Sequence, residues 1–299
     1  MKKVGSPAFE TEMVQHRTFA SMHSVLDMIF PGLTDQAADT LFKDIRSEAH
    51  VLENLLSDYD PSAETCILND KARHQWVTVS DRLWDILTEC RHFHVLTKGY
   101  FDIGSGWHKK ACSGSTDVSV TGVRLLETDE QQRRIRFAAP EIALDFGAIG
   151  KGLLLRETDK LLAQNGVENC FISFGGSSIL TRGRHPHGNY WPVAFRSSSD
   201  MNPVFQMNDD FASFSQGTPD GMNATAHIVN PYTNQTEGNF RISGAQADCP
   251  VIAEVVSTVL ILLLPDEATS LTAIFRLKKA FITGRDKTNR PVKEFYYES

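Results

Sequence analysis

Residues 144–176 read LDFGAIGKGLLLRETDKLLAQNGVENCFISFGG, and this stretch decides the fold. A turn of small residues follows Asp145, and from Gly152 the apolar positions recur with helical spacing until Gly166 closes the helix. An apolar strand, Cys170–Phe174, comes next and ends in two glycines, which permit either a close approach to a ligand or a bend. A helix that leads directly into a buried strand predicts a mixed fold of helices and sheet.

The turn before this helix suits a ligand that carries phosphate. Gly147, Ala148 and Gly150 have little or no side chain, so a ligand can approach their backbone closely. Lys151 supplies a positive charge, and the N–H groups at the start of a helix favour an anion. The spacing matches neither a Walker loop nor the Rossmann G-x-G-x-x-G pattern. A purely structural turn would explain the glycines equally well.

The segments on the N-terminal side predict two helices and several strands. Thr34–Ser57 carries apolar residues at helical intervals, and Ser80 can cap a second amphipathic helix that runs through Phe93. The segments expected to be strands are Arg17–Ile29, Thr121–Glu127 and Arg133–Phe137, the last two as a hairpin.

The C-terminal half predicts short strands and one apolar helix. Tyr190–His227 is broken by Gly, Pro, Asn and Asp into short strands, with a surface turn at Arg196–Pro203. Ile242–Ala245 and Ala280–Thr283 are expected to be strands, and Val251–Leu263 a buried helix. Helices interleaved with strands, without a regular βαβ rhythm, predict an α/β or α+β fold.

Composition limits the classes of function. The chain has 299 residues, 41% of them apolar, which is enough for one large domain or two closely packed ones. Its 30 basic and 37 acidic residues give a net charge of −7, so neither a nucleic-acid partner nor an anionic membrane surface is expected. The five cysteines are widely separated, which favours buried thiols over disulfides or a zinc site.

No membrane span or secretory signal is expected. The longest apolar run, Val255–Leu264, has about half the length of a bilayer-spanning helix. The first residues include Lys2 and Lys3 but lack the apolar region of a signal peptide, so a cytoplasmic protein is expected.

Three further segments carry motifs. Residues 54–69 read NLLSDYDPSAETCILN, residues 226–234 read AHIVNPYTN, and residues 253–263 read AEVVSTVLILL. Together with Phe101-Asp102 and the Asp145 turn, they resemble the FAD:protein FMN transferases of the ApbE family. That family's pattern runs S-x-Y-x-x-x-S, G-x-F-D, L-D-x-G-x-I-x-K-G, G-G, H-I-x-[DN]-P and A-[DE]-x-x-[ST]-T. The resemblance covers nearly the whole chain and implies one unit, residues 1–299, of two lobes with a nucleotide cleft between them.

The resemblance also implies an activity and a set of site residues. Members of the family bind FAD and use a divalent metal, usually magnesium (Mg2+), to transfer FMN to a threonine of an acceptor protein, with release of AMP. The implied metal ligands are the carbonyl of Ala148 and the side chains of Glu254 and Thr258, an all-oxygen set. His227 would be the general base, and Lys151 would stabilise developing charge. The residues implied to contact the flavin nucleotide are Met22, Tyr59, Tyr100, Phe101, Asp102, Asp145, Lys151 and Val229.

The residue types give these roles physical support, and each has an ordinary alternative. Glu254 and Thr258 are four residues apart and share one helix face, although a solvent-facing glutamate and a threonine bonded to its own helix would also fit. A histidine titrates near neutrality, as a general base must, but His227 could equally be a core residue. Tyr59 and Tyr100 could stack on a flavin or adenine ring, or simply pack in the protein.

Several positions depart from the usual family residues. Glu254 stands for the usual metal-binding aspartate, and Ser177 for the acidic residue that commonly follows Gly-Gly. Ile103-Gly104 replaces Pro-Thr, residues 215–217 read SQG for TSG, and residues 230–234 read NPYTN for D-P-x-T-G. Fewer carboxylates would weaken metal binding while leaving dinucleotide binding intact. Two alternatives therefore stand beside transfer: a non-catalytic FAD-binding protein, and a metal-dependent FAD pyrophosphatase in which water replaces threonine.

Overall fold

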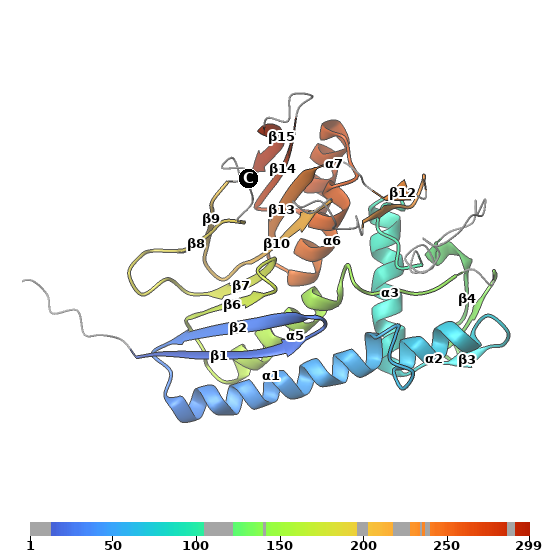
Figure 1. The fold of residues 1–299 in the computed structure, drawn as a ribbon, viewed down its shortest axis with the longest axis horizontal. Helices are drawn as coiled ribbons and strands as arrows, with labels where there is room; N and C mark the ends of the chain where they lie inside the picture. The colour runs from blue at the N-terminus through green and yellow to red at the C-terminus, as the bar shows by residue number, and fades with distance from the viewer. Residues whose placement is uncertain are drawn as a thin grey trace, which may run out of the picture.

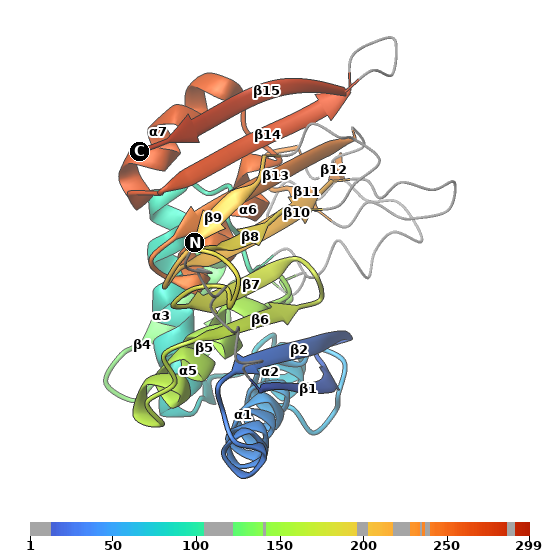
Figure 2. The same ribbon diagram turned by 90° about the vertical axis from the view of Figure 1, so that its left-hand side faces the viewer.

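An antiparallel sheet of eight strands forms the centre of the molecule (Figure 1). The computed structural model describes residues 13–104, 122–139, 142–195, 203–217, 228–233, 235–236, 240–285 and 291–299. Neighbouring strands are antiparallel throughout this sheet, which fans out from β1 to β15 in Figure 2. The strands, in spatial order, are β1 (Val14–Ser21), β2 (Ser24–Pro31), β6 (Cys170–Phe174), β7 (Ser178–Arg182), β10 (Phe211–Gln216), β13 (Arg241–Ala247), β14 (Lys279–Arg285) and β15 (Pro291–Glu298).

Helices cover one face of this sheet, and a short strand pair packs on the other (Figure 1). The helices are α1 (Asp35–Leu56), α5 (Gly150–Gln164), α6 (Pro250–Leu260) and α7 (Pro265–Phe275). The strand pair is β8 (Trp191–Val193) with β9 (Phe205–Met207). The predicted mixed α/β class is confirmed, and the two faces of the sheet bury separate hydrophobic clusters.

A smaller group of elements lies beside the helical face. Its three strands pair in the order β3-β5-β4, and α2 and α3 pack next to them (Figure 1). A two-stranded pair, β11 with β12, lies near the top of α3 in the same view. The bounds are α2 (Glu64–Lys71), β3 (Val77–Thr78), α3 (Asp81–Leu96), a 3-10 turn (Val123–Leu125), β4 (Leu126–Asp129), β5 (Arg134–Phe137), β11 (Val229–Asn230) and β12 (Gln235–Thr236).

The long helices form where the sequence predicts them because capping residues and apolar spacing agree. Thr34 caps α1 by accepting a hydrogen bond from the Ala37 N–H at 3.3 Å, and Ser80 caps α3 in the same way. Gly166 ends α5 with φ +65°, a left-handed conformation that suits glycine. These predictions are confirmed, although α5 begins at Gly150 rather than Gly152.

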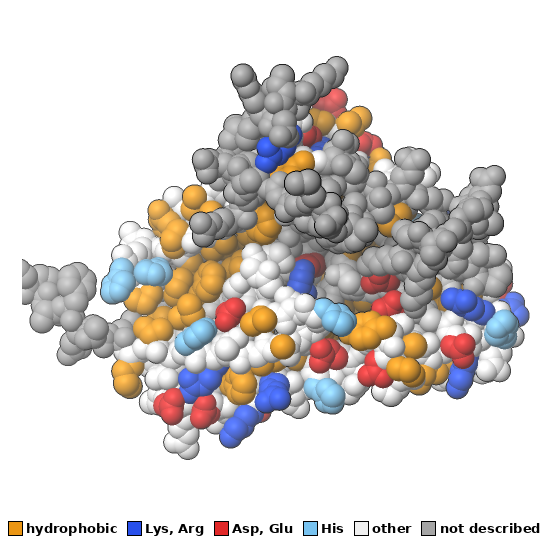
Figure 3. Space-filling view, viewed as in Figure 1, with side chains coloured by type: hydrophobic (Ala, Val, Ile, Leu, Met, Phe, Trp, Pro, Cys, Tyr) orange, Lys and Arg blue, Asp and Glu red, His pale blue; other side chains and the backbone are white. Residues whose placement is uncertain are grey.

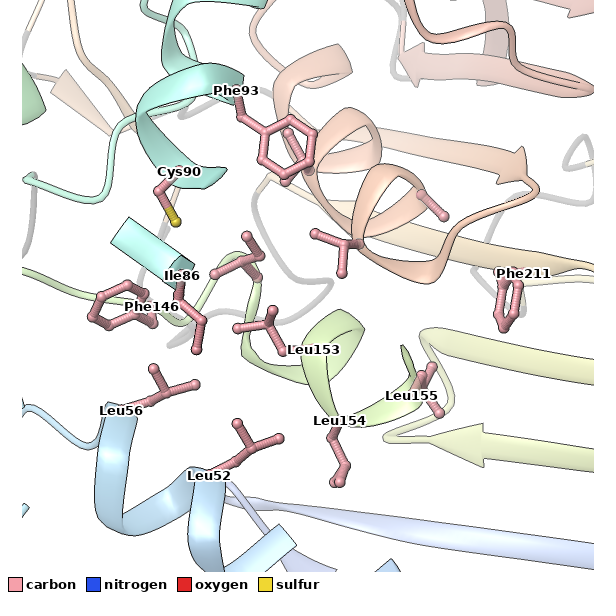
Figure 4. Packing of buried hydrophobic residues seen from close by; sticks show 14 of the residues in the cluster. Leu52, Leu56, Ile86, Cys90, Phe93, Phe146, Leu153, Leu154, Leu155 and Phe211 are labelled. Atoms are coloured by element: carbon pink, nitrogen blue, oxygen red, sulfur yellow. The ribbon is translucent and has the colours of Figure 1, made fainter. Parts of the chain in front are cut away.

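The core between the helices and the sheet converges on α5. Figure 4 shows Leu153 and Leu154 of α5 in the same cluster as Leu52 of α1 and Ile86 of α3. On its other side α5 touches α6 closely, because a Cβ on Gly152 would lie 2.9 Å from the Pro250 carbonyl oxygen. This approach of two backbones brings the start of α5 next to the first turns of α6, where Glu254 lies.

Some sequence predictions need correction. The segment Arg17–Ile29 is not one strand but a hairpin of β1 and β2, because Met22 and His23 turn the chain with φ values of 48° and 56°. Neither residue is among the Gly, Asn, Asp, Pro and Ser that mark turns, so this turn could not be predicted from the sequence. In the predicted hairpin, β4 and β5 do pair, but residues 123–125 form a 3-10 turn and Thr121 lies outside the described residues.

Other differences are shorter. The apolar helix ends at Leu260 rather than Leu263, and most of the predicted turn at 196–203 lies outside the described part. The two glycines after β6 both have positive φ and turn the chain into β7, and Gly175 also lines a cavity beside α6, so both interpretations of the Gly-Gly pair stay open. Helix α2 was not predicted because its eight residues lack an apolar stripe. The predictions also omitted α7, β7 and β15.

The expectation of buried thiols holds for two of the four described cysteines, Cys90 and Cys170, while Cys66 and Cys249 are half-buried. Within the described ranges, no helix is long and apolar enough to cross a membrane. The cysteines described by the structure, Cys66, Cys90, Cys170 and Cys249, are all free thiols. Figure 3 shows hydrophobic side chains gathered over the sheet at the left of the view, and charged side chains along the lower edge, where α1 lies.

Candidate functional site

A cleft of two chambers surrounds the start of α5. The first chamber, of about 350 Å³, is lined by Met22, His23 and Tyr59 on one side. The second, of about 380 Å³, is lined by residues 100–103, by the end of β10, and by α6. Asp145, Gly147 and Lys151 line both chambers, so the chambers meet at the turn before α5.

The first chamber is bounded by the turn of the β1–β2 hairpin. Glu53 of α1 accepts a hydrogen bond from the Met22 N–H at 2.6 Å, which ties the turn to the helix. The Met22 sulfur lies 3.6 Å from the point that a Cβ on Gly150 would occupy. The rings of His23 and Tyr59 lie 4.7 Å apart, and Tyr59 is 57% exposed. The chamber therefore offers an apolar wall and an exposed aromatic rim.

The turn between the chambers is held by a buried amide. The side chain of Asn69 accepts from the Leu144 N–H at 2.7 Å and donates to the Leu144 carbonyl at 2.9 Å. Asp145 then donates its N–H to the Ile103 carbonyl, and its carboxylate accepts from the Gly147 N–H at 2.7 Å. These bonds fix the backbone at the point where the sequence predicts a phosphate.

The segment 100–104 forms one wall of the second chamber. Asp102 accepts backbone hydrogen bonds from Gly104 at 2.7 Å and Val123 at 2.9 Å. Burial raises the pKa of Asp102, while these bonds and the nearby His94 and Arg124 oppose that rise. The Asp102 carboxylate thus holds the loop in place.

Tyr100 stands at the mouth of this chamber. Its ring meets the ring of Tyr232 edge to face, with 5.0 Å between centroids, and its hydroxyl donates to Glu267 at 3.3 Å. Burial raises the pKa of the Tyr100 hydroxyl, and the charge of Glu267 adds to the rise. The Tyr100 ring, a candidate for stacking on a ligand ring, therefore packs against the Tyr232 ring of another loop.

A buried carboxylate with a cation beside it lies deepest in the second chamber. Glu254, on α6, is 3% exposed, and its Oε1 forms an ion pair with the Lys151 ammonium. Its Oε2 accepts from Ser178 Oγ at 2.6 Å and from Ser213 Oγ at 3.0 Å. The Thr258 hydroxyl donates to the Glu254 carbonyl at 3.1 Å. Glu254 is therefore not solvent-facing, whereas Thr258 does make the bond to its own helix that the ordinary alternative foresaw.

The three residues implied to hold magnesium, Ala148, Glu254 and Thr258, all line this chamber. Each can offer an oxygen, the ligand atom that magnesium prefers. The Glu254 carboxylate already has a cation beside it, because it forms an ion pair with the Lys151 ammonium. The described residues contain no cluster of three or more His, Cys, Asp or Glu side chains, so a metal here would also need oxygens from its ligand.

The structure brings the predicted residues of its described part to this cleft. Met22 and Tyr59 line the first chamber; Tyr100, Phe101, Asp102, Val229, Ala148, Glu254 and Thr258 line the second; Asp145 and Lys151 line both. His227 lies outside the described residues, next to Ile228, which lines the second chamber.

Supporting residues were missed by the sequence analysis. Glu53 binds Met22, Ser178 and Ser213 bind Glu254, and Asn69 binds Leu144, the residue before Asp145. Ser178 lies 76 residues from Glu254 and Ser213 lies 41 residues from it, so no local pattern could reveal either contact.

Comparisons with known proteins identify the family of this chain. The model of the ApbE family matches residues 20–281. A protein of Escherichia coli K12 named FAD:protein FMN transferase is 23% identical over 265 residues, which are 80% of this chain and 75% of the relative. A protein of Chlamydia trachomatis with the same name is 25% identical over 183 residues, and the match covers 57% of each chain.

Two solved structures share the fold. The flavinyl transferase ApbE of Pseudomonas stutzeri, in its apo form, superposes with a TM-score of 0.80 at 18% identity over 94% of both chains. The flavin transferase ApbE of Vibrio cholerae gives a TM-score of 0.78 at 17% identity, over 95% of this chain and 97% of the other. At these identities the likeness establishes the architecture of sheet and helices.

Proposed function

This chain belongs to the ApbE family, and on that premise we propose that it transfers the FMN half of FAD to a threonine hydroxyl of an acceptor protein and releases AMP. The observation that carries the proposal is the junction of the two chambers at the start of α5, where Asp145, Gly147 and Lys151 line both. A dinucleotide consists of two ring systems joined by a pyrophosphate. Two chambers that meet at a helix start beside a lysine match that layout.

The chain's own groups would bind and orient the pyrophosphate. The backbone at the start of α5 has no capping side chain at Ile149, as far as the described residues go, so its N–H groups are suited to an anion. Lys151 lies in the first turn of this helix and would add a positive charge beside the phosphates. Asn69 and Asp145 hold the turn, so little ordering would be needed on binding.

Magnesium is the finer part of this proposal. It would be held by the Ala148 carbonyl, Glu254 and Thr258, and it would supply Lewis-acid stabilisation of charge on the phosphoryl oxygens. Glu254 is buried, which strengthens its electrostatic interactions.

His227 is proposed as the general base. It would accept the proton of the acceptor threonine, whose oxygen forms a bond to the FMN-side phosphorus. The bond between that phosphorus and the bridging oxygen breaks, and AMP leaves with the bridging oxygen. Lys151 would stabilise the negative charge that develops on the phosphoryl oxygens.

One observation favours a second candidate, a flavin-binding protein without transfer. Both oxygens of Glu254 already have partners, Lys151 on one side and two serines on the other. A metal that approaches this carboxylate meets the Lys151 ammonium, whose positive charge opposes metal binding. FAD binding that persists without any chemistry would fit this candidate.

The test combines calorimetry with two product assays. FAD is titrated into the protein with and without magnesium, AMP is then measured, and acceptor proteins in a cell extract are inspected for covalent flavin fluorescence on a denaturing gel. We expect FAD binding, AMP release and a fluorescent acceptor band, with His227→Ala abolishing the band and His50→Ala, a change at an exposed histidine of α1, preserving it.

The other outcomes separate the candidates. AMP without a fluorescent band would indicate a pyrophosphatase, and binding without AMP would indicate a flavin carrier. No binding of FAD under either condition would overturn the proposed function.

A further inference from the structure

The ion pair between Lys151 and Glu254 has the geometry of an exchange site. We propose that Lys151 is the counter-ion of Glu254 in the ligand-free protein and moves to the phosphate when a divalent cation and a phosphate-bearing ligand bind together. The inference rests on the proposed function for its ligand class. It adds that the divalent cation binds weakly on its own and tightly when the phosphate-bearing ligand is also bound.

Only one oxygen of Glu254 is able to change its partner easily. Oε2 is bonded to Ser178 of β7 and Ser213 of β10, both 1% exposed and both on adjacent strands of the sheet. Oε1 is bonded to Lys151, whose side chain is 22% exposed and has a long flexible stem. The serines thus fix one side of the carboxylate, and the lysine is the mobile partner.

The serine side is itself braced. Ser257 Oγ lies 3.0 Å from Ser213 Oγ and 3.1 Å from the Glu254 carbonyl oxygen. Ser215 Oγ lies 2.9 Å from Ser257 Oγ, which extends the network to the end of β10. Because these hydroxyls form a connected network, exchange at Oε1 would require no movement of the carboxylate.

Charge explains why the exchange would need the ligand. A divalent cation that approaches Glu254 with Lys151 in place meets an ammonium at ion-pair distance in a buried chamber, where repulsion is poorly screened. Lys151 lies in the first turn of α5, the end of a helix that attracts a phosphate. A phosphate there would draw the ammonium away and supply oxygens for the cation. Cation and ligand would therefore raise each other's affinity by the same factor.

The experiment measures Mn2+ binding to the ligand-free protein by electron paramagnetic resonance. Lys151→Gln removes the internal cation, and we expect Mn2+ to bind about tenfold or more tightly than in the wild type. Lys160→Gln is the matched control, because Lys160 is on the same helix and pairs with Glu157 at 2.9 Å. It should change Mn2+ affinity by less than about twofold. The gain should disappear in the double variant K151Q/E254Q.

A second measurement uses the wild type alone. ADP is added as a pyrophosphate-bearing probe, with correction for Mn2+ bound to free ADP, and we expect the protein to bind Mn2+ at least about tenfold more tightly in its presence. The enhancement should be smaller in K151Q. If K151Q is folded by circular dichroism and binds Mn2+ no better than the wild type, the exchange is refuted. Absence of coupling in the wild type refutes it as well, even if K151Q does not fold.

These outcomes are separate from the fate of the proposed function. Binding of FAD together with an unchanged Mn2+ affinity in K151Q would leave the proposed function standing and remove the exchange. Coupled binding of Mn2+ and ADP in a protein that does not bind FAD would do the reverse.

Discussion

Replacement of Gly152 by alanine tests how closely α5 and α6 must approach to build the second chamber. In an ordinary helix, glycine to alanine stabilises by up to about 1 kcal/mol. Here the added Cβ would lie 2.9 Å from the Pro250 carbonyl oxygen, 3.0 Å from the Val251 Cα and 3.1 Å from the Glu254 Cβ. We therefore expect G152A to be destabilising, the opposite of the helix-propensity effect.

The magnitude follows from the atoms involved. Two of the three are backbone atoms of α6, which have no rotamer to escape to, so the helices must move apart. Overpacking of this kind costs about 1–3 kcal/mol, and the helix-propensity gain offsets at most about 1 kcal/mol. Because backbone atoms yield little, the upper end of this range applies, and subtracting about 1 from about 3 kcal/mol gives an expected fall in the free energy of unfolding of about 2 kcal/mol. Because Glu254 is one of the contacts, its ion pair with Lys151 should also loosen.

Urea unfolding followed by circular dichroism measures the first effect, and FAD titration measures the second. Gly188→Ala is the control, since its Cβ would come no closer than 3.7 Å to the Tyr190 carbonyl oxygen. G188A should be unchanged or more stable by up to about 1 kcal/mol. A G152A protein as stable as the wild type, with unchanged FAD affinity, would refute the close contact between the helices.

Three further predictions concern burial and support. Burial raises the pKa of the Cys170 thiol to about 12 from its usual 9.0, so between those pH values the unfolded chain ionises and the folded chain does not. The contribution of the buried thiol to stability is complete below pH 9 and is lost as the pH rises toward 12. Above pH 9 the free energy of unfolding should therefore fall by about 1.4 kcal/mol per pH unit more in the wild type than in Cys170→Ala, as measured by urea unfolding from pH 8 to 10. Asn69→Ala should destabilise by about 2–4 kcal/mol in the same assay, because it leaves the buried N–H and carbonyl of Leu144 unpaired. A loss below about 0.5 kcal/mol would show that the Asn69 side chain does not hold this turn. Glu53→Ala should weaken FAD binding in calorimetry by releasing the Met22 turn, with only about 1 kcal/mol lost in stability, whereas unaltered binding would exclude Met22 from the ligand contact.

Much of the fold could be read from local sequence signals. Helices α1 and α3 have N-terminal capping residues, α5 is followed by Gly166, and all three have apolar periodicity, so local and tertiary preferences agree. The β1–β2 turn was missed because Met22 and His23 adopt left-handed conformations that the Glu53 carboxylate and the strand pairing impose. Such a turn is determined by contacts with α1, which are distant in the sequence.

The order of the eight strands also lay beyond the sequence analysis. Strand β2 pairs with β6, more than 130 residues later, and β7 pairs with β10 rather than with the strands that immediately follow it. Pairing over such distances depends on the whole set of buried faces. The site was easier to predict, because the motifs that resemble the family contain the residues that line the cleft. The buried side chains that support these residues follow no motif.

The glutamate at position 254 shows how a departure from the usual residue fits its surroundings. The two serines that donate hydrogen bonds to Oε2 are on two strands of the sheet, and the lysine that pairs with Oε1 is at the start of α5. The Glu254 carboxylate thus bridges two strands of the sheet and the start of α5, and Gly152 lets α5 approach α6 closely at this point. Glu254 therefore keeps its charge in the second chamber while its other oxygen is anchored to Ser178 and Ser213. The loss of an aspartate at this position is thus not the loss of a carboxylate from the site, and the capacity to hold a cation depends on whether Lys151 leaves.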